Sequence, residues 1–273
     1  MKIILFGSEG TIGSYVKSEL LKNHNDLYFV ENKTRIKRSI RYKILKKNFL
    51  TKKKFFSEKD IVIYLPWGNL DDFNSKLHIK KEFPEHFANI KKLLKLGMKN
   101  ILVSGTCFEY KKKNGIMSET SKISPATNYG IAKDRLRIKL NMLKKIYKFK
   151  LSWIRIFYIY GNKNDNNNLW SQLNNCAKNK KNKNFNMSSG EQYRDYIHVK
   201  DLAKNIVAIA LKKRNFGVIN VCSGKPVQIK KLVKKWKIKY KLKINLKFNR
   251  LSIPNYESIK FWGSDKKLKK ILN

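Results

Sequence analysis

Short hydrophobic runs alternate with stretches of helical spacing along the first two-thirds of the chain. The runs have the length of buried strands and turn residues at their ends; they are Ile3–Phe6, Leu27–Val30, Ile61–Leu65, Ile101–Ser104 and Leu151–Phe157. Between them, apolar residues recur at helical intervals over Ile12–Leu21, Phe83–Leu96 and Ile131–Ile146. Strand–helix–strand repetition of this kind predicts an α/β fold, with a parallel sheet covered by helices on both faces.

The pattern becomes less regular in the last third of the chain. Residues 162–168 are rich in Asn and residues 178–184 in Lys and Asn, which is typical of surface loops. Beyond them, Val218–Cys222 and Ile244–Phe248 predict strands, and Ile229–Trp236 predicts a helix. We therefore expect a smaller lobe built mostly from this part of the chain.

A glycine-rich turn follows the first predicted strand directly. The seven residues from Gly7 carry glycine at their first, fourth and seventh positions. The first glycine permits a tight turn, the second lets the backbone approach a diphosphate, and the third lets a helix pack on the strand. Free N–H groups and the dipole at a helix N-terminus favour negative charge there. This order predicts a dinucleotide site, to which Gly7, Gly10, Thr11, Ile12 and Gly13 contribute.

Tyr129 and Lys133 are four positions apart, so on a helix they lie on the same side, about 5–6 Å apart at Cβ. A lysine so placed stabilises a phenolate, and we expect it to lower the pKa of Tyr129 from about 10 toward neutrality. Such a tyrosine can exchange a proton with a sugar or alcohol oxygen. Thr106 comes 23 residues earlier, after the fourth predicted strand, and its hydroxyl can hold a substrate oxygen beside the phenol.

The order of these signals resembles the extended branch of the short-chain dehydrogenase/reductase superfamily, the NAD-dependent epimerase/dehydratase family. That branch contains nucleotide-sugar epimerases, dehydratases and reductases. Three later segments also resemble segments of the branch, namely Arg155–Gly161, Arg194–Ala203 and Gly217–Gly224. The resemblance spans nearly the whole chain. It implies a Rossmann-like, doubly wound parallel sheet with a small C-terminal substrate-binding lobe.

The domain division that follows has two parts. Residues 1–168 are expected to form the NAD(P)-binding Rossmann domain, with a returning segment near residues 194–222. Residues 169–273 are expected to form mainly the substrate-binding lobe.

The resemblance also implies roles for single residues. Tyr129 would be the general acid/base, Lys133 would lower its pKa and bind the nicotinamide ribose, and Thr106 would orient the substrate. Arg194 would bind the nucleotide diphosphate of the substrate, a task that suits a forked guanidinium. A surface arginine that pairs with Asp195 is the alternative.

Two aromatic residues are further candidates for the substrate pocket. Trp67 could form a wall of the sugar pocket, and the alternative is a plain core residue. Tyr158 stands where the family has an asparagine in the segment that begins at Arg155, so substrate contacts there differ from those of the usual epimerases.

Residues near the second predicted strand bear on the type of cofactor. Glu31 ends that strand, where a carboxylate bonds the adenosine ribose 2′-OH and disfavours a 2′-phosphate. Lys33, Arg35 and Arg38 follow at once and could bind that phosphate. Asn48 stands where the family often has an aspartate near the adenine. The cofactor is therefore expected to be NAD(P), with NAD favoured over NADP.

Departures from the family pattern narrow the reaction. The 4,6-dehydratases carry an acid and a base directly after the threonine, where this chain has Cys107 and Phe108, so a dehydratase is disfavoured. The helix before the fourth predicted strand carries His78, Glu82 and His86, where an asparagine often stands.

Other segments point to a subgroup of the family. Tyr64–Gly68, Gly105–Tyr110, Phe185–Gln192 and Phe261–Ser264 together resemble members that act on deoxysugar nucleotides. We therefore expect a 4-ketoreductase of a dTDP-, CDP- or GDP-linked 4-keto-6-deoxyhexose, in deoxysugar or polysaccharide biosynthesis. A nucleotide-sugar C4 epimerase is the alternative within the same chemistry. A non-catalytic, basic descendant of the fold that binds RNA or a protein is the alternative from another class, and the complete set of Thr106, Tyr129 and Lys133 argues against it.

Charge changes this picture little. The formal net charge is +43, but the excess is almost all lysine, spread from Lys2 to Lys270, and only nine of the 62 basic residues are arginine. Arginine is the preferred residue for bidentate phosphate and base contacts, so we expect no specific nucleic-acid partner.

Composition suggests a cytoplasmic protein. No apolar run approaches the roughly 20 residues of a membrane span, and three scattered cysteines favour a reducing compartment. The four histidines and three cysteines show no metal-ligand spacing, so we expect no metal site. The resemblance implies a homodimer through the helix that carries Tyr129 and Lys133 together with the helix before it. If lysines of these helices faced each other across the interface, their repulsion would weaken the dimer.

Overall fold

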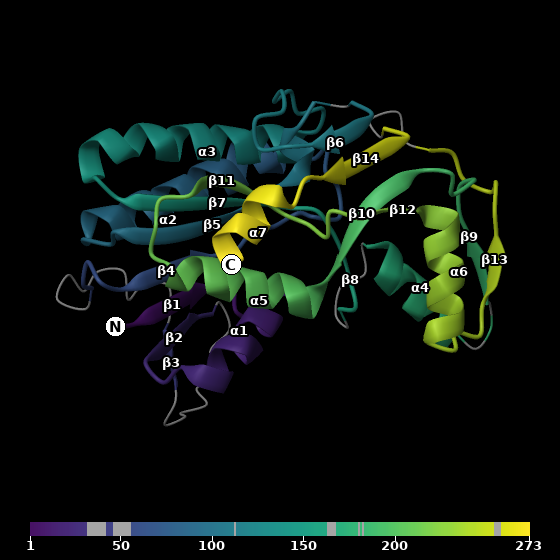
Figure 1. Cartoon of the computed structure of the whole chain (residues 1–273), viewed down its shortest axis with the longest axis horizontal. Helices are drawn as coiled ribbons and strands as arrows, with labels where there is room; N and C mark the ends of the chain where they lie inside the picture. The colour runs from purple at the N-terminus through teal and green to yellow at the C-terminus, as the bar shows by residue number, and fades with distance from the viewer. Residues whose placement is uncertain are drawn as a thin grey trace.

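A seven-stranded parallel sheet forms the larger part of the molecule (Figure 1). The computed structural model describes residues 1–31, 42–45, 56–111, 113–162, 168–179, 181, 183–253 and 258–273. The strands of the large sheet, in their spatial order, are β11 (Gly217–Val221), β7 (Lys150–Ile156), β5 (Asn100–Thr106), β4 (Ile61–Tyr64), β1 (Ile3–Phe6), β2 (Leu27–Val30) and β3 (Tyr42–Leu45). Every pairing between them is parallel, which confirms the α/β, doubly wound fold expected from the sequence.

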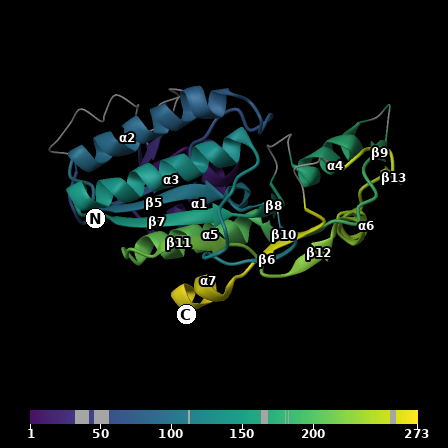
Figure 2. The ribbon, with the colours of Figure 1, turned by 90° about the horizontal axis from the view of Figure 1, so that it is seen from above.

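Helices cover both faces of this sheet (Figure 2). On one face, α1 (Thr11–Asn23) packs against α5 (Val199–Leu211), and α7 (Lys266–Leu272) contacts α5 and β11. On the other face, α2 (Phe83–Lys95) packs against α3 (Asn128–Tyr147). The inner strands are buried on both sides, which explains why they read as continuous apolar runs.

The smaller lobe has its own aromatic core. It contains α4 (Leu169–Lys178), α6 (Ile229–Lys239) and the parallel pair β9 (Asn184–Asn186) and β13 (Asn245–Lys247). Trp170 and Trp236 pack edge to face there, with ring centroids 5.2 Å apart. A second sheet lies between the lobe and the large sheet. Its strands are β12 (Pro226–Gln228), β10 (Tyr193–His198), β14 (Lys260–Gly263), β6 (Gly115–Met117) and, paired with β10, β8 (Tyr158–Tyr160).

The chain passes between the large sheet and the lobe four times. It leaves after β7 through β8, returns from β10 into α5, leaves again from β11 to β12, and returns from β14 into α7. The C-terminal helix α7 therefore lies on the large sheet, although most of the last third of the chain belongs to the lobe (Figure 1).

The observed elements differ from the predicted ones mainly at their ends. Helix α3 begins at Asn128 and not at residue 131, because the Thr127 side chain caps it and accepts a hydrogen bond from the Gly130 N–H at 3.1 Å. Tyr129 therefore lies in the first turn of this helix. Of the two stretches expected to be loops, residues 163–167, 180 and 182 lie outside the described part of the chain.

Candidate active site

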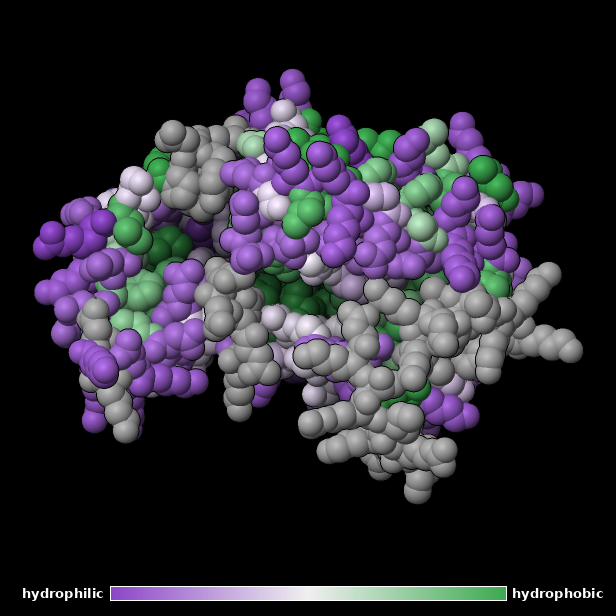
Figure 3. Space-filling view, turned by 180° about the vertical axis from the view of Figure 1, so that it is seen from behind, coloured by the Kyte–Doolittle hydropathy of each residue, from purple (hydrophilic) through white to green (hydrophobic). Residues whose placement is uncertain are grey.

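A cavity of about 710 Å³ opens at the carboxyl ends of the parallel strands. The glycine turn after β1, the ends of β4 and β5, the first turns of α3 and the segment from Ile156 to Ile159 line it. A space-filling view from behind shows a hollow with a hydrophobic floor, and hydrophilic side chains predominate among the coloured residues around it (Figure 3). One cavity thus contains the glycine turn and the predicted proton-transfer residues.

The glycine turn has the geometry of a close backbone approach. Gly7 has a φ of +77°, and a Cβ at Gly13 would lie 1.8 Å from the Gly7 carbonyl oxygen, so no side chain fits there. The Gly10 N–H donates to the Gly7 carbonyl at 3.1 Å, and Gly10 is the N-cap residue of α1. Thr11 and Ile12 also line the cavity. The first turn of α1 therefore points its free N–H groups toward a position that suits an anionic group.

Glu31 lies at the end of β2 and lines the same cavity. Its carboxylate accepts hydrogen bonds from the Ser8 hydroxyl at 2.9 Å and from the Lys17 ammonium at 3.0 Å. The other residues considered for cofactor selectivity, Lys33, Arg35, Arg38 and Asn48, lie outside the described residues.

Thr106 is the last residue of β5 and begins a short 3₁₀ turn over Cys107–Glu109. The Thr106 hydroxyl accepts a hydrogen bond from the Phe108 N–H at 3.3 Å, and the Thr106 N–H donates to Glu109 Oε1 at 2.9 Å. This reciprocal capping box fixes the backbone on both sides of the hydroxyl.

Aromatic rings enclose the Tyr129 phenol. Phe73 stacks on it with ring centroids 5.3 Å apart, and the rings of Trp67 and Phe108 lie 6.1 and 6.2 Å away. Burial raises the pKa of Tyr129, and the hydrogen bond with the Thr106 side chain acts in the opposite direction. The expectation of a lowered pKa is therefore wrong for this arrangement, because desolvation of the phenolate exceeds the stabilisation by its neighbours.

Lys133 lies one helical turn after Tyr129 and is 2% exposed. Its ammonium donates to the Ser104 carbonyl at 2.8 Å and lies 4.0 Å from the Trp67 ring centroid and 5.9 Å from the Tyr129 ring centroid. Burial lowers the pKa of Lys133 to about 7, and the more distant charges of Glu109 and Glu82 oppose that shift. The structure thus brings Thr106, Tyr129 and Lys133 together at one end of the cavity.

Comparison with known proteins identifies the family. The model of the NAD dependent epimerase/dehydratase family matches residues 3–222, which is most of the chain. The chain belongs to this family. Its members share NAD(P) as the cofactor, and the membership supports the enzymatic modification of a nucleotide sugar.

Two curated relatives cover most of the chain. A dTDP-6-deoxy-L-talose 4-dehydrogenase (NAD(+)) from Aggregatibacter actinomycetemcomitans is 27% identical over 97% of this chain and 100% of its own length. An uncharacterised UDP-glucose epimerase from Bacillus subtilis is 24% identical over 85% of this chain and 80% of its own length.

Solved structures share the fold at lower identity. A UDP-N-acetylglucosamine 4-epimerase from Methanobrevibacter ruminantium superposes with a TM-score of 0.82 at 20% identity, over 99% of this chain and 91% of that one. A UDP-glucuronic acid 4-epimerase from Bacillus cereus has a TM-score of 0.82 at 20% identity, over 100% and 93%.

The remaining two residues expected to bind the substrate, Tyr158 and Arg194, lie toward the smaller lobe. Tyr158 lines the cavity. Arg194 lies beside it, with its guanidinium carbon 5.7 Å from the Tyr158 ring centroid, but is itself 2% exposed and donates to the Tyr193 carbonyl at 2.9 Å. Arg194 is therefore not a surface residue. Its neighbour Asp195 accepts hydrogen bonds from the Ser223 N–H at 2.7 Å and from the Gly224 N–H at 2.9 Å.

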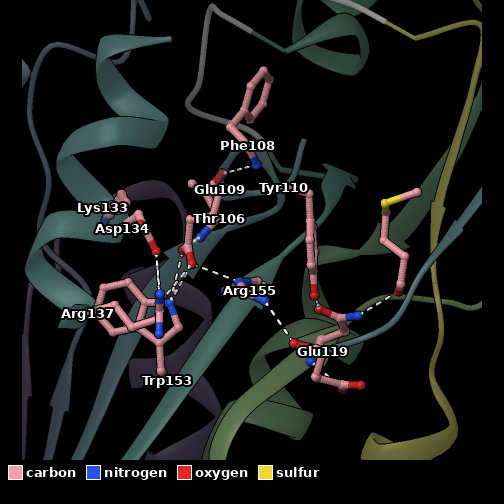
Figure 4. Close-up of polar contacts among 12 residues, drawn as sticks. Thr106, Phe108, Glu109, Tyr110, Glu119, Lys133, Asp134, Arg137, Trp153 and Arg155 are labelled. Carbon is pink, nitrogen blue, oxygen red and sulfur yellow. Dashed lines mark hydrogen bonds and ion pairs between the residues drawn. The ribbon is translucent and has the colours of Figure 1, made fainter. Parts of the chain in front are cut away.

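The buried ion pair between Glu109 and Arg155, which lies next to Thr106, was not predicted from the sequence (Figure 4). Glu109 is fully buried and accepts hydrogen bonds from Arg155 Nε at 2.7 Å and Trp153 Nε1 at 2.9 Å, in addition to the Thr106 N–H. The Arg155 guanidinium lies 4.4 Å from the Tyr110 ring centroid. The sequence signal for this pair was a single charged residue, Glu109 or Arg155, within each of two mainly apolar segments.

The described residues contain no group of three or more His, Cys, Asp or Glu side chains arranged to hold a metal ion. No helix among them has the length and apolarity required to cross a membrane.

Proposed function

We propose that this protein catalyses NAD(P)-dependent reduction of the 4-keto group of a nucleotide-linked 4-keto-6-deoxyhexose. The observation that carries the proposal is the convergence of Thr106, Tyr129 and Lys133 in the cavity that also contains the glycine turn. The name of the curated relative from Aggregatibacter, a 4-dehydrogenase of a dTDP-linked 6-deoxysugar, supports the position and the sugar class.

The residues suit proton transfer to a developing alkoxide. The reduced cofactor supplies a hydride to the carbonyl carbon when it is bound. The carbonyl oxygen then takes the electron pair of the C=O π bond, and the Tyr129 phenol donates its proton to that oxygen. Burial raises the pKa of Tyr129, which keeps the phenol in the protonated form that reduction requires. The Lys133 ammonium, 5.9 Å from the ring, favours the phenolate that remains.

The substrate contacts belong to the same proposal. The Thr106 hydroxyl holds the substrate oxygen, Trp67 and Tyr158 contact the sugar, and Arg194 binds the nucleotide diphosphate. The glycine turn with Thr11 and Ile12 binds the cofactor diphosphate, and Lys133 binds the nicotinamide ribose. NAD is the favoured cofactor because the Glu31 carboxylate lines the cavity at the end of β2, where it suits a ribose hydroxyl.

The two residues after Thr106 do not suit a dehydratase, which needs an acid and a base at these positions. Cys107 is buried, and burial raises the pKa of its thiol, so it stays protonated at neutral pH and does not act as a base. Phe108 carries no proton donor or acceptor on its side chain. The Glu82 carboxylate also lines the cavity, but three donors already bind it, namely the Gly68 N–H, the Asn69 amide and His86.

Turnover of added cofactor tests the proposal. We would combine the purified protein with a panel of 4-keto-6-deoxy sugar nucleotides and follow NADH and NADPH absorbance. Oxidation of the cofactor by one substrate, abolished in Tyr129→Phe and retained in Tyr147→Phe at the far end of the same helix, is the expected result. Interconversion of sugar isomers without net oxidation would replace the reductase by the C4 epimerase. Failure to bind either cofactor would contradict both.

We also infer a homodimer, because helix α3 presents an exposed apolar stripe. Ile138, Met142 and Ile146 are 45%, 57% and 70% exposed and follow one another at intervals of four residues. The exposed Lys139 and Lys145 beside this stripe would oppose association at low salt. Light scattering behind size exclusion, at low and high salt, measures the mass; a monomer at both would contradict the dimer.

A further inference from the structure

A second group of side chains lies beside the proton-transfer residues, and apart from the sugar contact of Trp67 it has no role in the reaction proposed above. The Trp67 cluster consists of Trp67 from the loop after β4, His78 and Glu82 from the π-helical turn η3 (His78–Glu82), and His86 from α2. Trp67, Glu82 and His86 line the cavity, while His78 is fully buried beneath them. Single π-helical turns frequently occur at functional sites.

His78 contacts Tyr129, with ring centroids 5.3 Å apart, and Trp67 contacts both proton-transfer residues. The Lys133 ammonium lies 4.0 Å from its ring centroid, within cation–π distance, and the Tyr129 ring packs edge-on against it. His86 stacks on the Trp67 indole, with ring centroids 4.8 Å apart and an angle of 23° between the ring planes. The indole N–H donates to His78 Nδ1 at 3.1 Å. The two histidines therefore fix both the plane of the indole and its rotation within that plane.

Glu82 anchors this arrangement. Its carboxylate accepts hydrogen bonds from the Gly68 N–H at 2.8 Å, from the Asn69 amide at 2.8 Å and from His86 Nε2 at 3.1 Å. A Cβ at Gly68 would lie 2.7 Å from Glu82 Oε1, so a side chain at this position would displace the carboxylate. The hydrogen bond from His86 lowers the pKa of Glu82 to about 2 despite its burial. Glu82 thus joins the loop that carries Trp67 to the helix that carries His86.

The partners of His78 determine its protonation state. An indole N–H can only donate, so His78 Nδ1 must accept. The Asp72 carbonyl, 2.9 Å from His78 Nε2, can only accept, so Nε2 must carry the proton. His78 is therefore neutral with both nitrogens engaged, and it has no lone pair or proton free for the substrate.

We infer that Trp67 is a positioning residue for Lys133 and Tyr129, and that His78 holds Trp67 in place as a neutral hydrogen-bond bridge. The inference rests on the proposed function for its catalytic consequence. It assigns Trp67 the task of covering Lys133 and holding its ammonium at the Ser104 carbonyl, which differs from the sugar contact considered above.

Chemical labelling tests the inference without any substrate. Acetylation of single lysines, followed by mass spectrometry, compares Lys133 with the exposed Lys139 of the same helix. The rates are compared after correction for the fraction of neutral amine, which the lowered pKa of Lys133 increases. On that scale Lys133 should react about tenfold more slowly than Lys139 in the unchanged protein, because an amine that is 2% exposed meets the reagent only through local opening. His78→Leu, which cannot bridge the indole and Asp72, should bring the two rates to within about threefold of each other.

A conservative variant separates positioning from simple packing. Gln in His78→Gln can accept from the indole with its oxygen and donate to the Asp72 carbonyl with its nitrogen, so Lys133 should stay shielded. Trp67→Phe keeps an aromatic face but loses the indole N–H, and its labelling should fall between those of the unchanged protein and His78→Leu. If His78→Leu does not fold, the test is the comparison of Lys133 labelling between His78→Gln and Trp67→Phe.

Once a substrate is known, steady-state kinetics of the same variants provide a second test. His78→Leu should lower kcat about 10–100-fold with little change in KM, and His78→Gln should restore most of the activity. Unchanged shielding of Lys133 in both His78→Leu and Trp67→Phe would overturn the inference. Equal loss of activity in His78→Gln and His78→Leu would also overturn it, since the hydrogen-bond bridge to Trp67 would then not account for the effect of His78. An inactive unchanged protein that still shows the labelling pattern would count against the proposed function and leave the positioning role standing.

Discussion

Lys133 and Arg155 are both almost completely buried, at 2% and 1% exposed, yet their surroundings are opposite. Lys133 faces the cavity, donates to the neutral Ser104 carbonyl and lies on an aromatic ring, so burial lowers its pKa to about 7. Arg155 has a carboxylate at 2.7 Å, and the charge of Glu109 raises the pKa of its guanidinium. Of these two buried cations, Lys133 titrates near neutrality, whereas Arg155 stays charged and anchors the segment after Thr106 through Glu109.

Removing the fixed cation should have the largest effect on stability. Arg155→Met leaves the fully buried Glu109 carboxylate without its close counter-charge, and we expect a loss of about 3–5 kcal/mol in the free energy of unfolding. Urea denaturation measures it, with the exposed Arg135→Met as the matched control. A loss below about 1 kcal/mol would show that the pair is not a structural anchor.

Removing the titrating cation should lower activity without destabilising the fold. Lys133→Met keeps a long apolar side chain in the buried position, so the fold should remain, while loss of the ammonium beside Tyr129 should lower kcat about 10²–10⁴-fold. Steady-state kinetics with the exposed Lys139→Met as control checks this. Full activity in folded Lys133→Met would remove Lys133 from the proposed mechanism.

The pH dependence of stability should distinguish the two cations further. The pKa of Lys133 is about 7 in the folded chain, below the value of about 10.4 in an unfolded chain, so the unfolded state binds more protons between these values. The stability of the unchanged protein relative to Lys133→Met should therefore rise as pH increases from 7 toward 10. The full destabilisation, of the order of 3–5 kcal/mol, remains below pH 7, where both states are protonated. Paired urea titrations across this range measure the difference, and a flat difference would contradict the lowered pKa.

The smallest of these effects should come from Arg155→Lys. The ammonium keeps the charge opposite Glu109, but it loses the planar fork and the stacking on the Tyr110 ring. We expect a loss of about 1–2 kcal/mol, measured as a fall in thermal midpoint. A loss as large as that of Arg155→Met would mean that guanidinium geometry, and not charge, accounts for the anchor.

Local signals in the sequence predicted much of the fold and of the site. The central strands and the helices α1, α2 and α3 were predicted because their apolar spacing is set by burial within each element. The glycine turn was predicted because its contacts lie within seven residues. Family membership and the parallel α/β fold are confirmed. The roles of Tyr129, Thr106 and Lys133 remain proposals, although the three side chains do meet.

The remaining features depend on contacts between distant segments. The three-residue strands β6, β8 and β12 are too short for a periodic signal, and their partners alone make them strands. The Glu109–Arg155 pair joins residues 46 positions apart. The direction of the Tyr129 pKa shift depends on burial of the phenol by Phe73, Trp67 and Phe108. These three residues lie outside the helix that carries Tyr129, so the spacing within that helix does not predict their contact. His78, Glu82 and His86 were noted in the sequence only as a departure from the family pattern, and their contacts with Trp67 depend on the fold.

The four passes of the chain between the large sheet and the lobe have a consequence for engineering. No single cut separates the two parts, because α5, β11 and α7 of the large part follow lobe segments in the chain. Exchange of the lobe between relatives would therefore require two separate inserts in the gene, one between β7 and α5 and one between β11 and α7.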